Sequence, residues 1–335
     1  MLAPMMSISE MQRLSATINP AWQSPVADAA AARWGVPAGN ASWWRSSGTH
    51  VFTLPPDGRY SRRFLRFVPD RHRTQGQVLA VARFASDLAG AGIRLARPLP
   101  SRSDALVESI DTEIGLIHAC VIEAAAGAQI EAEQMTPARA DAWGRALAQL
   151  HVADHTSVAD LPDSNADLQT MRDGIDDDPE LSRVLARLAD SLDELPSTPD
   201  WIGATHGDFE PDNMAWVGDV PTCFDFDEAA TTWFIADVAN AVRDLTTMGR
   251  PRVEQQQRFD AFVAGYRATR DLPTEQLDAL PLLAATGMAL RLVDLRRALI
   301  VDPSVGEESE SLQSLRSRLE HVAERDRAYL LAALM

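Results

Sequence analysis

The order of two patterns constrains this chain most: strand-like segments fill its first third, and helical periodicity fills most of the remainder. Short runs rich in aromatic and β-branched residues alternate with turn sequences such as "SG" and "PPDG", which favour antiparallel hairpins. These runs predict strands at residues 41–46, 50–54, 62–68, 104–110 and 115–123. We therefore expect an antiparallel sheet in the N-terminal third.

Helical patterns surround and follow this sheet. Two short ones lie within residues 7–35, and a longer one at about 74–90 falls between strands. From Thr136 onward helical spacing dominates, except in an acidic stretch at 154–180 that predicts a loop. The expected fold class is α+β with two lobes, a small antiparallel-sheet lobe with one helix and a larger, mainly helical lobe. The expected domain limits, with the N-terminal helices in the first lobe, are 1–125 and 126–335.

Composition narrows the class of protein. Hydrophobic residues make up 46% of the 335 and charged residues 24%, which is typical of globular domains. The net charge of −17 disfavours nucleic acid and membrane surfaces as partners and favours a cationic or neutral small molecule. The two cysteines lie in apolar runs, and neither a leader nor a membrane-spanning segment is indicated, so a cytoplasmic location is expected. Oligomeric state is not indicated.

A polar motif, "HGDFEPDN" at residues 206–213, lies between apolar stretches. Charged groups this dense serve packing poorly, because each carboxylate is costly to desolvate. The following segment "TCFDFDEA" at 222–229 alternates apolar and acidic residues, as a short strand does. We expect Asp208, Asn213 and Asp225 to meet. Their oxygen atoms suit Mg²⁺, although a solvated polar turn is the simpler alternative.

The spacing His206-x-Asp208-x4-Asn213, followed by Asp225, resembles the catalytic loop and metal aspartate of kinase-like phosphotransferases. The likeness is specifically to the aminoglycoside phosphotransferase and choline kinase group, and it covers residues 45–290. It implies a two-lobed protein kinase-like fold, ATP and Mg²⁺ as cofactors, and transfer of phosphate to a hydroxyl group of a small molecule.

The resemblance also implies a role for each motif residue. Asp208 is expected to accept or orient the proton of the acceptor hydroxyl, as the catalytic residue. Asn213 and Asp225 are expected to hold Mg²⁺. His206 and Asp237 are expected to support the loop structurally.

The chain departs from this family in the basic residue that is expected to bind the nucleotide phosphates. Kinase-like enzymes place a lysine on the third strand, yet all 31 basic residues here are arginine. Arg66 is the candidate replacement, with a solvent-facing strand position as the alternative. The helix at 74–90 contains no glutamate to pair with that cation, and Gln77 is the nearest polar candidate.

Nucleotide contacts rest on weaker signals. There is no glycine-rich phosphate loop of the protein-kinase type, and only Ser47 and Gly48 in the first hairpin offer small residues near phosphate. By resemblance alone, adenine recognition falls to backbone groups that begin at Glu123.

The acceptor is the least constrained part. Glu210 stands where Ser/Thr protein kinases usually carry a lysine, and together with Asp227 it predicts a negative cleft suited to aminoglycosides, choline-like alcohols, homoserine or amino sugars. Asp227 is alternatively a metal neighbour or an exposed strand carboxylate. Trp233 is expected either to stack on the acceptor or to belong to the core. Two other functions stay open: a Ser/Thr protein kinase, and a pseudokinase that binds nucleotide without transfer.

Overall fold

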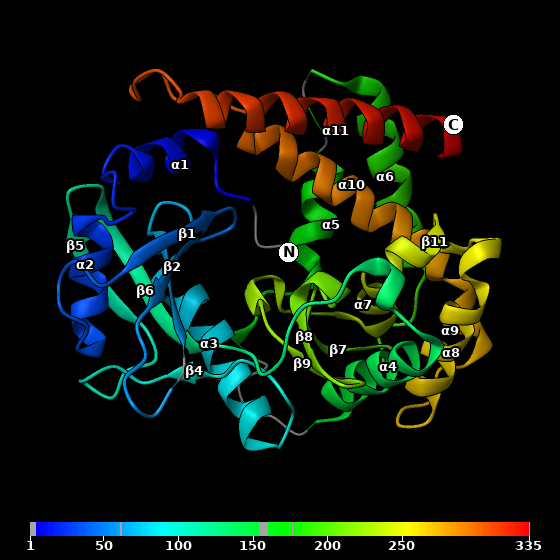
Figure 1. Cartoon of the computed structure of the whole chain (residues 1–335). Coiled ribbons are helices and arrows are strands. Elements are labelled where there is room, and N and C mark those ends of the chain that lie inside the picture. Colours follow the sequence, from blue (N-terminus) through cyan, green and yellow to red (C-terminus); the bar gives the residue numbers. More distant parts are fainter. Residues whose placement is uncertain (1–4, 61, 154–159, 174, 176, 335) are drawn as a thin grey trace.

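The computed structural model describes residues 5–60, 62–153, 160–173, 175 and 177–334. Its elements form two lobes, a sheet-rich one drawn in blue and cyan and a helical one drawn in green to red (Figure 1). The predicted α+β class is therefore confirmed. In the described part of the chain, no helix combines the length and the apolar character that a membrane span requires.

A six-stranded antiparallel sheet forms the first lobe. Its spatial order is β1-β2-β3-β6-β4, and β5 pairs with another part of β6. The strands are β1 (Ser42–Ser46), β2 (His50–Leu54), β3 (Arg63–Pro69), β4 (Pro98–Leu99), β5 (Glu108–Thr112) and β6 (Gly115–Glu123). Two strands depart from expectation: β4 was not predicted, and β5 begins four residues after the predicted start at 104.

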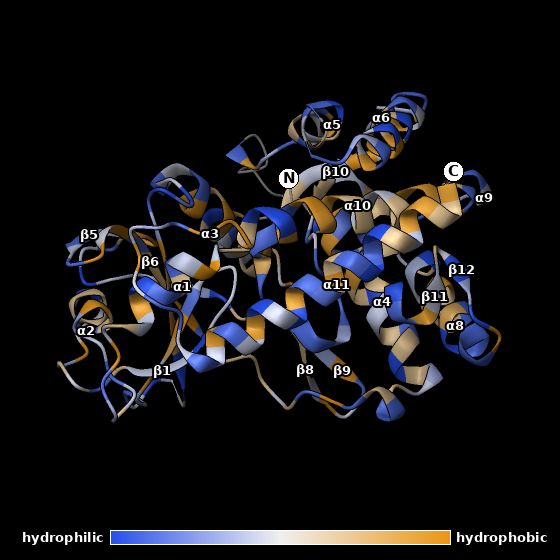
Figure 2. Cartoon of the chain, turned by 90° about the horizontal axis from the view of Figure 1, so that it is seen from above, coloured by the Kyte–Doolittle hydropathy of each residue, from blue (hydrophilic) through white to orange (hydrophobic). Residues whose placement is uncertain are grey.

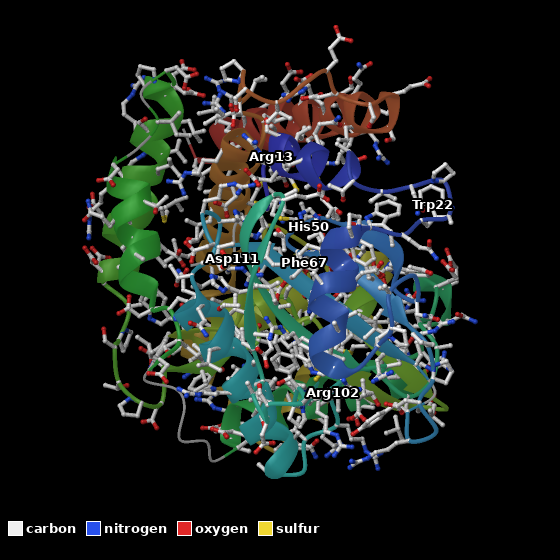
Figure 3. The ribbon with its side chains drawn as sticks, turned by 90° about the vertical axis from the view of Figure 1, so that its left-hand side faces the viewer. Arg13, Trp22, His50, Phe67, Arg102 and Asp111 are labelled. Carbon is white, nitrogen blue, oxygen red and sulfur yellow. The ribbon has the colours of Figure 1, made fainter. Side chains whose placement is uncertain are left out.

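The two faces of this sheet have different neighbours. Leu65 and Phe67 of β3 lie in a buried cluster with Phe52 and with α2 (Pro25–Ala31). The rings of His50 and Phe67 lie 5.3 Å apart in the same region (Figure 3). Because side chains alternate along a strand, Arg66 points the other way, toward the helical lobe.

Helix α3 (Gln75–Gly90) matches the predicted helix at 74–90. Thr74 caps it: its hydroxyl accepts a hydrogen bond from the Gln77 backbone, and the Gln77 side chain accepts one from the Thr74 backbone. The Gln77 side chain is thereby used at the helix start. Its expected pairing with Arg66 is wrong for this reason.

The second lobe packs helices around a large apolar core. Helices α4 and α8 approach each other very closely at Gly144. A Cβ at this position would lie 2.0 Å from the Phe262 carbonyl oxygen, so glycine is needed there. Apolar and polar residues alternate along α6 and α11, as expected of helices with one buried face (Figure 2). The helices are α4 (Pro137–Val152), α5 (Ser164–Asp173), α6 (Pro179–Asp193), α7 (Phe234–Ala241), α8 (Gln256–Arg267), α9 (Thr274–Asp278), α10 (Leu280–Ala298) and α11 (Glu310–Leu334).

Three two-stranded sheets flank the polar motifs of this lobe. Strand β7 pairs with β10, β8 with β9 and β11 with β12. Their limits are β7 (Ile202–Thr205), β8 (Met214–Val217), β9 (Val220–Cys223), β10 (Ala230–Trp233), β11 (Thr246–Thr247) and β12 (Arg250–Pro251).

Two local expectations are wrong. The strand predicted at 222–229 ends at Cys223, and the 3-10 turn η5 (Phe226–Glu228) follows, because Asp225 adopts a left-handed φ of 69° that strand pairing does not tolerate. The acidic stretch at 154–180 contains α5, where Leu168 and Met171 supply a buried face. Residues 154–159, 174 and 176 of that stretch lie outside the described part.

The N-terminal helix α1 (Ile8–Ser15) links the sheet lobe to the end of the chain. Met6 and Met11 pack with Val68 of β3, and Leu312 and Leu315 of α11 contact the same cluster. Figure 3 labels Arg13 on this helix, which forms an ion pair with Asp302 at 2.5 Å. The proposed limit between the lobes at residue 125 stays a prediction, although all six strands of the large sheet precede it.

Candidate active site

The motif at 206–213 forms a tight loop after β7. Gly207 has a φ of 84°, and a Cβ at this position would lie 2.1 Å from the Glu228 carbonyl oxygen. Glycine is therefore needed for both backbone conformation and space. The loop ends in the 3-10 turn η4 (Pro211–Asn213), which leads directly into β8.

Asp237 of α7 fixes the backbone of this loop. Its buried carboxylate accepts hydrogen bonds from the backbone N–H groups of His206, at 2.7 Å, and Gly207, at 2.9 Å. It also lies 3.0 Å from Nε2 of His151. Burial opposes ionisation, but the hydrogen bond and charge of His151 lower the pKa of Asp237. The structure thus places Asp237 where a loop support is expected.

His206 is buried, which favours the neutral form of its imidazole. Burial lowers its pKa, against the nearby charge of Asp237. The backbone N–H of Asp208 donates to His206 Nδ1 at 3.3 Å, so Nε2 donates to the Phe224 carbonyl at 3.2 Å. This tautomer joins the loop to the strand end that carries Asp225.

The Asp208 carboxylate lies at the tip of the loop. Asn213 Nδ2 donates to its Oδ2 at 2.7 Å, and Arg243 Nη1 donates to its Oδ1 at 3.1 Å. The Asn213 amide nitrogen also bonds to the Asp208 carbonyl at 3.0 Å. These bonds use the Asn213 amide nitrogen and fix the position of the Asp208 carboxylate.

Asp225 is brought next to Asn213 by the chain itself. The backbone N–H of Phe224 donates to the Asn213 carbonyl at 3.0 Å. The Asp225 carboxylate then forms ion pairs with Arg66 at 2.7 Å and Arg45 at 2.9 Å. Burial would raise its pKa, but the charge and hydrogen bond of Arg66 lower it. Asp225 is thus held ionised.

Asn213 and Asp225 fit a divalent cation by donor chemistry. One carboxylate and one amide oxygen, completed by phosphate oxygens and water, form a ligand set of the Mg²⁺ type. The described residues contain no group of three His, Cys, Asp or Glu side chains that could hold a metal alone.

Arg66 is buried and has three partners. Its Nη2 lies 2.7 Å from Asp225, 2.6 Å from Asp227 and 3.1 Å from Thr49 Oγ1. Burial opposes its charge, but Asp225 and Asp227 raise its pKa. The solvent-facing alternative for Arg66 is therefore wrong.

Asp227 replaces the missing glutamate as the second partner of the cation. Arg73, just before α3, also pairs with it at 3.1 Å, so one carboxylate bridges two arginines. The helix side of this network thus supplies a cation where kinase-like enzymes supply an anion. Asp227 faces arginines, and the expectation that it is an exposed strand carboxylate is wrong.

The first hairpin and the end of β6 flank Arg66. Ser47 and Gly48 lie at the hairpin turn, where Ser47 N–H donates to the Thr49 carbonyl at 3.1 Å. The Glu123 N–H already donates to the Arg97 carbonyl at 3.0 Å. An adenine ring would therefore have to use the Glu123 carbonyl or N–H groups of later residues.

Two cavities meet at Asp208. The larger, about 580 Å³, is lined by Arg66, Ser47, Asn213 and Asp225 among others. The smaller, about 230 Å³, is lined among others by residues of the 206–213 loop and of α10. Asp208 and Glu228 line both, so the Asp208 carboxylate lies at the junction of the two cavities.

Of the three residues expected near the acceptor, Glu210 and Trp233 have clearly different surroundings. Glu210 pairs with Arg243 and lines the larger cavity, and burial together with Asp208 raises its pKa to about 7. Trp233 is only 5% exposed, and its Nε1 donates to the Pro196 carbonyl at 3.2 Å. It lines neither cavity, which favours the core alternative for Trp233.

The sequence patterns missed several charged residues of this region, among them Arg73, which pairs with Asp227. Arg45 and Arg243 pair with motif aspartates from positions 180 and 35 residues away, and no local pattern reveals such pairs. Glu228 and Asp294 line the smaller cavity. Glu228 had a usable signal, since it follows Asp225 by three residues in an acidic run.

The sequence matches known proteins over most of this region. The profile of the phosphotransferase enzyme family matches residues 45–272. A protein of Deinococcus radiodurans described as uncharacterized is 31% identical over 232 residues, 66% of this chain and 67% of that protein. The amicoumacin kinase of Bacillus subtilis is 23% identical over 63% of this chain and 64% of its own length.

Solved structures agree in fold. An amicoumacin kinase, hAmiN, in complex with AMP-PNP, Ca²⁺ and Ami has a TM-score of 0.72 at 19% identity, covering 90% of this chain and 92% of its own. A microcompartment-associated aminopropanol kinase has a TM-score of 0.65 at 21% identity, covering 92% and 98%. The TM-scores establish a kinase-like fold. The profile match covers more than half of the chain and shows that the chain belongs to the phosphotransferase enzyme family.

Proposed function

We propose that this protein transfers the terminal phosphate of ATP, with Mg²⁺, to a hydroxyl group of a small amine-bearing or sugar-like molecule. The observation that carries the proposal is the position of Asp208 at the junction of two cavities. The larger cavity contains Arg45 and Arg66 beside the proposed metal ligands Asn213 and Asp225, which suits a nucleotide with its cation. The smaller cavity has a limited volume and is lined by charged side chains of both signs, which suits a small polar acceptor; these are Asp208, Glu228, Asp294, Arg243 and Arg291.

The larger cavity supports nucleotide binding. Arg66 is positioned to bind phosphate oxygens, and the hairpin at Ser47 and Gly48 offers backbone N–H groups beside it. Asn213 and Asp225 are the proposed ligands of Mg²⁺, which when bound would neutralise charge on the phosphates. The related hAmiN structure contains AMP-PNP and Ca²⁺, a nucleotide and a divalent cation.

Asp208 is the proposed catalytic residue. Its carboxylate faces both spaces, so an acceptor hydroxyl in the smaller cavity can donate a hydrogen bond to it while pointing at the nucleotide. Hydrogen bonds from Asn213 and Arg243 keep the carboxylate fixed in position for this role. The transfer is proposed to be direct, without a phosphorylated enzyme.

The smaller cavity favours an acceptor with an amine. Glu228 and Asp294 line it, and burial raises the pKa of Asp294 to about 6 and that of Glu228 well above its usual value. A buried carboxylate with a raised pKa is stabilised when an ammonium group arrives as its partner. Related structures are named for amicoumacin, aminopropanol and spectinomycin, which supports a small-molecule acceptor.

The proposal is tested by the rate of ADP release from Mg·ATP with a panel of acceptors. The panel contains aminoglycosides, macrolides, choline, homoserine, amino alcohols, sugars and a generic protein, and Asp208→Asn is the control variant. Stimulation by one small-molecule class, reduced about 10²- to 10⁴-fold in the variant, supports the proposal.

Two results would replace it. Labelling of protein alone favours a Ser/Thr protein kinase. Binding of Mg·ATP without stimulation by any acceptor favours a pseudokinase, in which the arginine network holds nucleotide without transfer.

A further inference from the structure

Arg45 lies at the edge of the nucleotide cavity, on β1 just before the hairpin turn. Its Nη2 donates to Asp225 Oδ2 at 2.9 Å, while Arg66 occupies Oδ1 of the same carboxylate at 2.7 Å. Both oxygens of the proposed metal ligand are therefore taken by arginine. A metal bound to Asp225 has to compete with a guanidinium group.

The two arginines differ in how firmly they are held. The Arg66 side chain is 10% exposed and has three acceptors, two of them carboxylates. The Arg45 side chain is 51% exposed, and Asp225 is its one side-chain partner among the described residues. An exposed ion pair of this kind is weak, because water and salt screen it. Arg45 is thus the arginine that can change partner at low cost.

Charge balance gives Arg45 a second partner. In the described chain, the larger cavity is lined by seven carboxylates and by two arginines, Arg45 and Arg66. Arg66 is already neutralised by Asp225 and Asp227. The phosphates of a nucleotide are strongly anionic, so they require a further cation in this cavity, and Arg45 is in position to supply it.

We propose that Arg45 is a phosphate-binding residue that exchanges partners when Mg·ATP binds. Its guanidinium leaves Asp225, which frees a carboxylate oxygen for the metal, and donates to the β- or γ-phosphate. Arg45 and Arg66 would then together bind the phosphates, in place of the missing lysine. This inference rests on the proposed function, because it assumes that ATP occupies the larger cavity.

The test compares binding of adenosine, AMP, ADP and ATP by calorimetry, each with Mg²⁺, for the wild type, Arg45→Gln and Arg45→Lys. The control is Arg59→Gln, which removes an exposed arginine of the same lobe that lines neither cavity. Arg45→Gln is expected to weaken ADP and ATP about tenfold or more, and to leave adenosine and AMP within twofold. Arg45→Lys is expected to lie between, since it keeps the charge and loses the fork.

A second readout changes in the opposite direction. Binding of Mn²⁺ without nucleotide, followed by the signal of the free ion in electron paramagnetic resonance, should become about two- to fivefold tighter in Arg45→Gln. The reason is that Asp225 then loses a competing guanidinium. A merely structural role for Arg45 predicts no such opposition.

Three results overturn the inference. They are unchanged ADP affinity in Arg45→Gln, equal weakening of adenosine and ADP, and weaker rather than tighter Mn²⁺ binding. If the wild type binds ATP no better than adenosine, the proposed function itself fails and the inference falls with it. If the wild type binds ATP more tightly than adenosine and Arg45→Gln binds ADP as the wild type does, only the role of Arg45 is rejected.

Discussion

The two walls of the nucleotide cavity are held together in different ways. The catalytic-loop wall is fixed by backbone N–H groups that converge on one buried carboxylate, Asp237. The opposite wall is a network of ion pairs, in which Arg45, Arg66 and Arg73 share two aspartates. Backbone bonds to a buried group are costly to break, whereas an exposed ion pair exchanges partners readily.

This difference separates two tasks. Asp208, the proposed catalytic residue, must be held in place before the acceptor arrives, because misplacement of the proton acceptor is costly in rate. The phosphate-binding groups have to accommodate a ligand that brings its own charge and a metal. A network of arginines supplies cations for that purpose, and Arg66 lowers the pKa of Asp225 against the effect of burial.

The largest expected effect concerns the fixed wall. Asp237→Ala removes the acceptor of two backbone N–H groups and the partner of buried His151, so the free energy of unfolding should fall by about 3–5 kcal/mol. Urea unfolding followed by circular dichroism measures this change. Asp244→Ala, which removes an exposed carboxylate nearby, should stay within about 0.5 kcal/mol. Equal effects of the two variants would contradict the distinction between the walls.

A smaller effect is expected in the ionic wall. Arg66→Lys keeps the charge, but an ammonium cannot reproduce the fork that joins Asp225, Asp227 and Thr49. The KM for ATP should rise about tenfold, with kcat affected less, in steady-state kinetics. An improvement with lysine would show that arginine here is a tolerated substitute rather than part of an arginine network.

The smallest effect is a dependence on pH. Burial and Asp208 raise the pKa of Glu210 to about 7, above its unfolded value, so the folded state binds a proton that the unfolded state has lost. Stability should therefore fall as pH rises from about 4.5 to 7, by about 1 kcal/mol in all, because water and the charge of Arg243 reduce the contribution of a partly exposed carboxylate. Glu210→Gln should flatten this part of the curve in thermal unfolding at several pH values. An unchanged slope would mean that Arg243 keeps Glu210 ionised throughout.

The elements of the fold were largely predictable from local patterns. The hairpins and α3 follow from residue alternation and turn chemistry, and the spacing of His206, Asp208 and Asn213 predicts a tight polar loop. The helix in the acidic stretch was missed, because its apolar residues are sparse among carboxylates. Charge density concealed the amphipathic face of α5.

The partners of the charged residues were not predictable in the same way. Arg66 was the expected cation, but its link to Asp227 spans 161 residues and depends on how the lobes meet. Gln77 was the wrong partner because a local capping bond satisfies it. Ion pairs of this kind are set by tertiary packing, and a single sequence does not encode them in a local pattern.

The most direct test of the central claim is ³¹P NMR of Mg·ATP with the acceptor that best stimulates ADP release. The account predicts that a new phosphomonoester resonance grows in step with ADP, and that Asp208→Asn abolishes both. Consumption of ATP that yields only inorganic phosphate, or a phosphomonoester that forms equally in Asp208→Asn, would contradict the account.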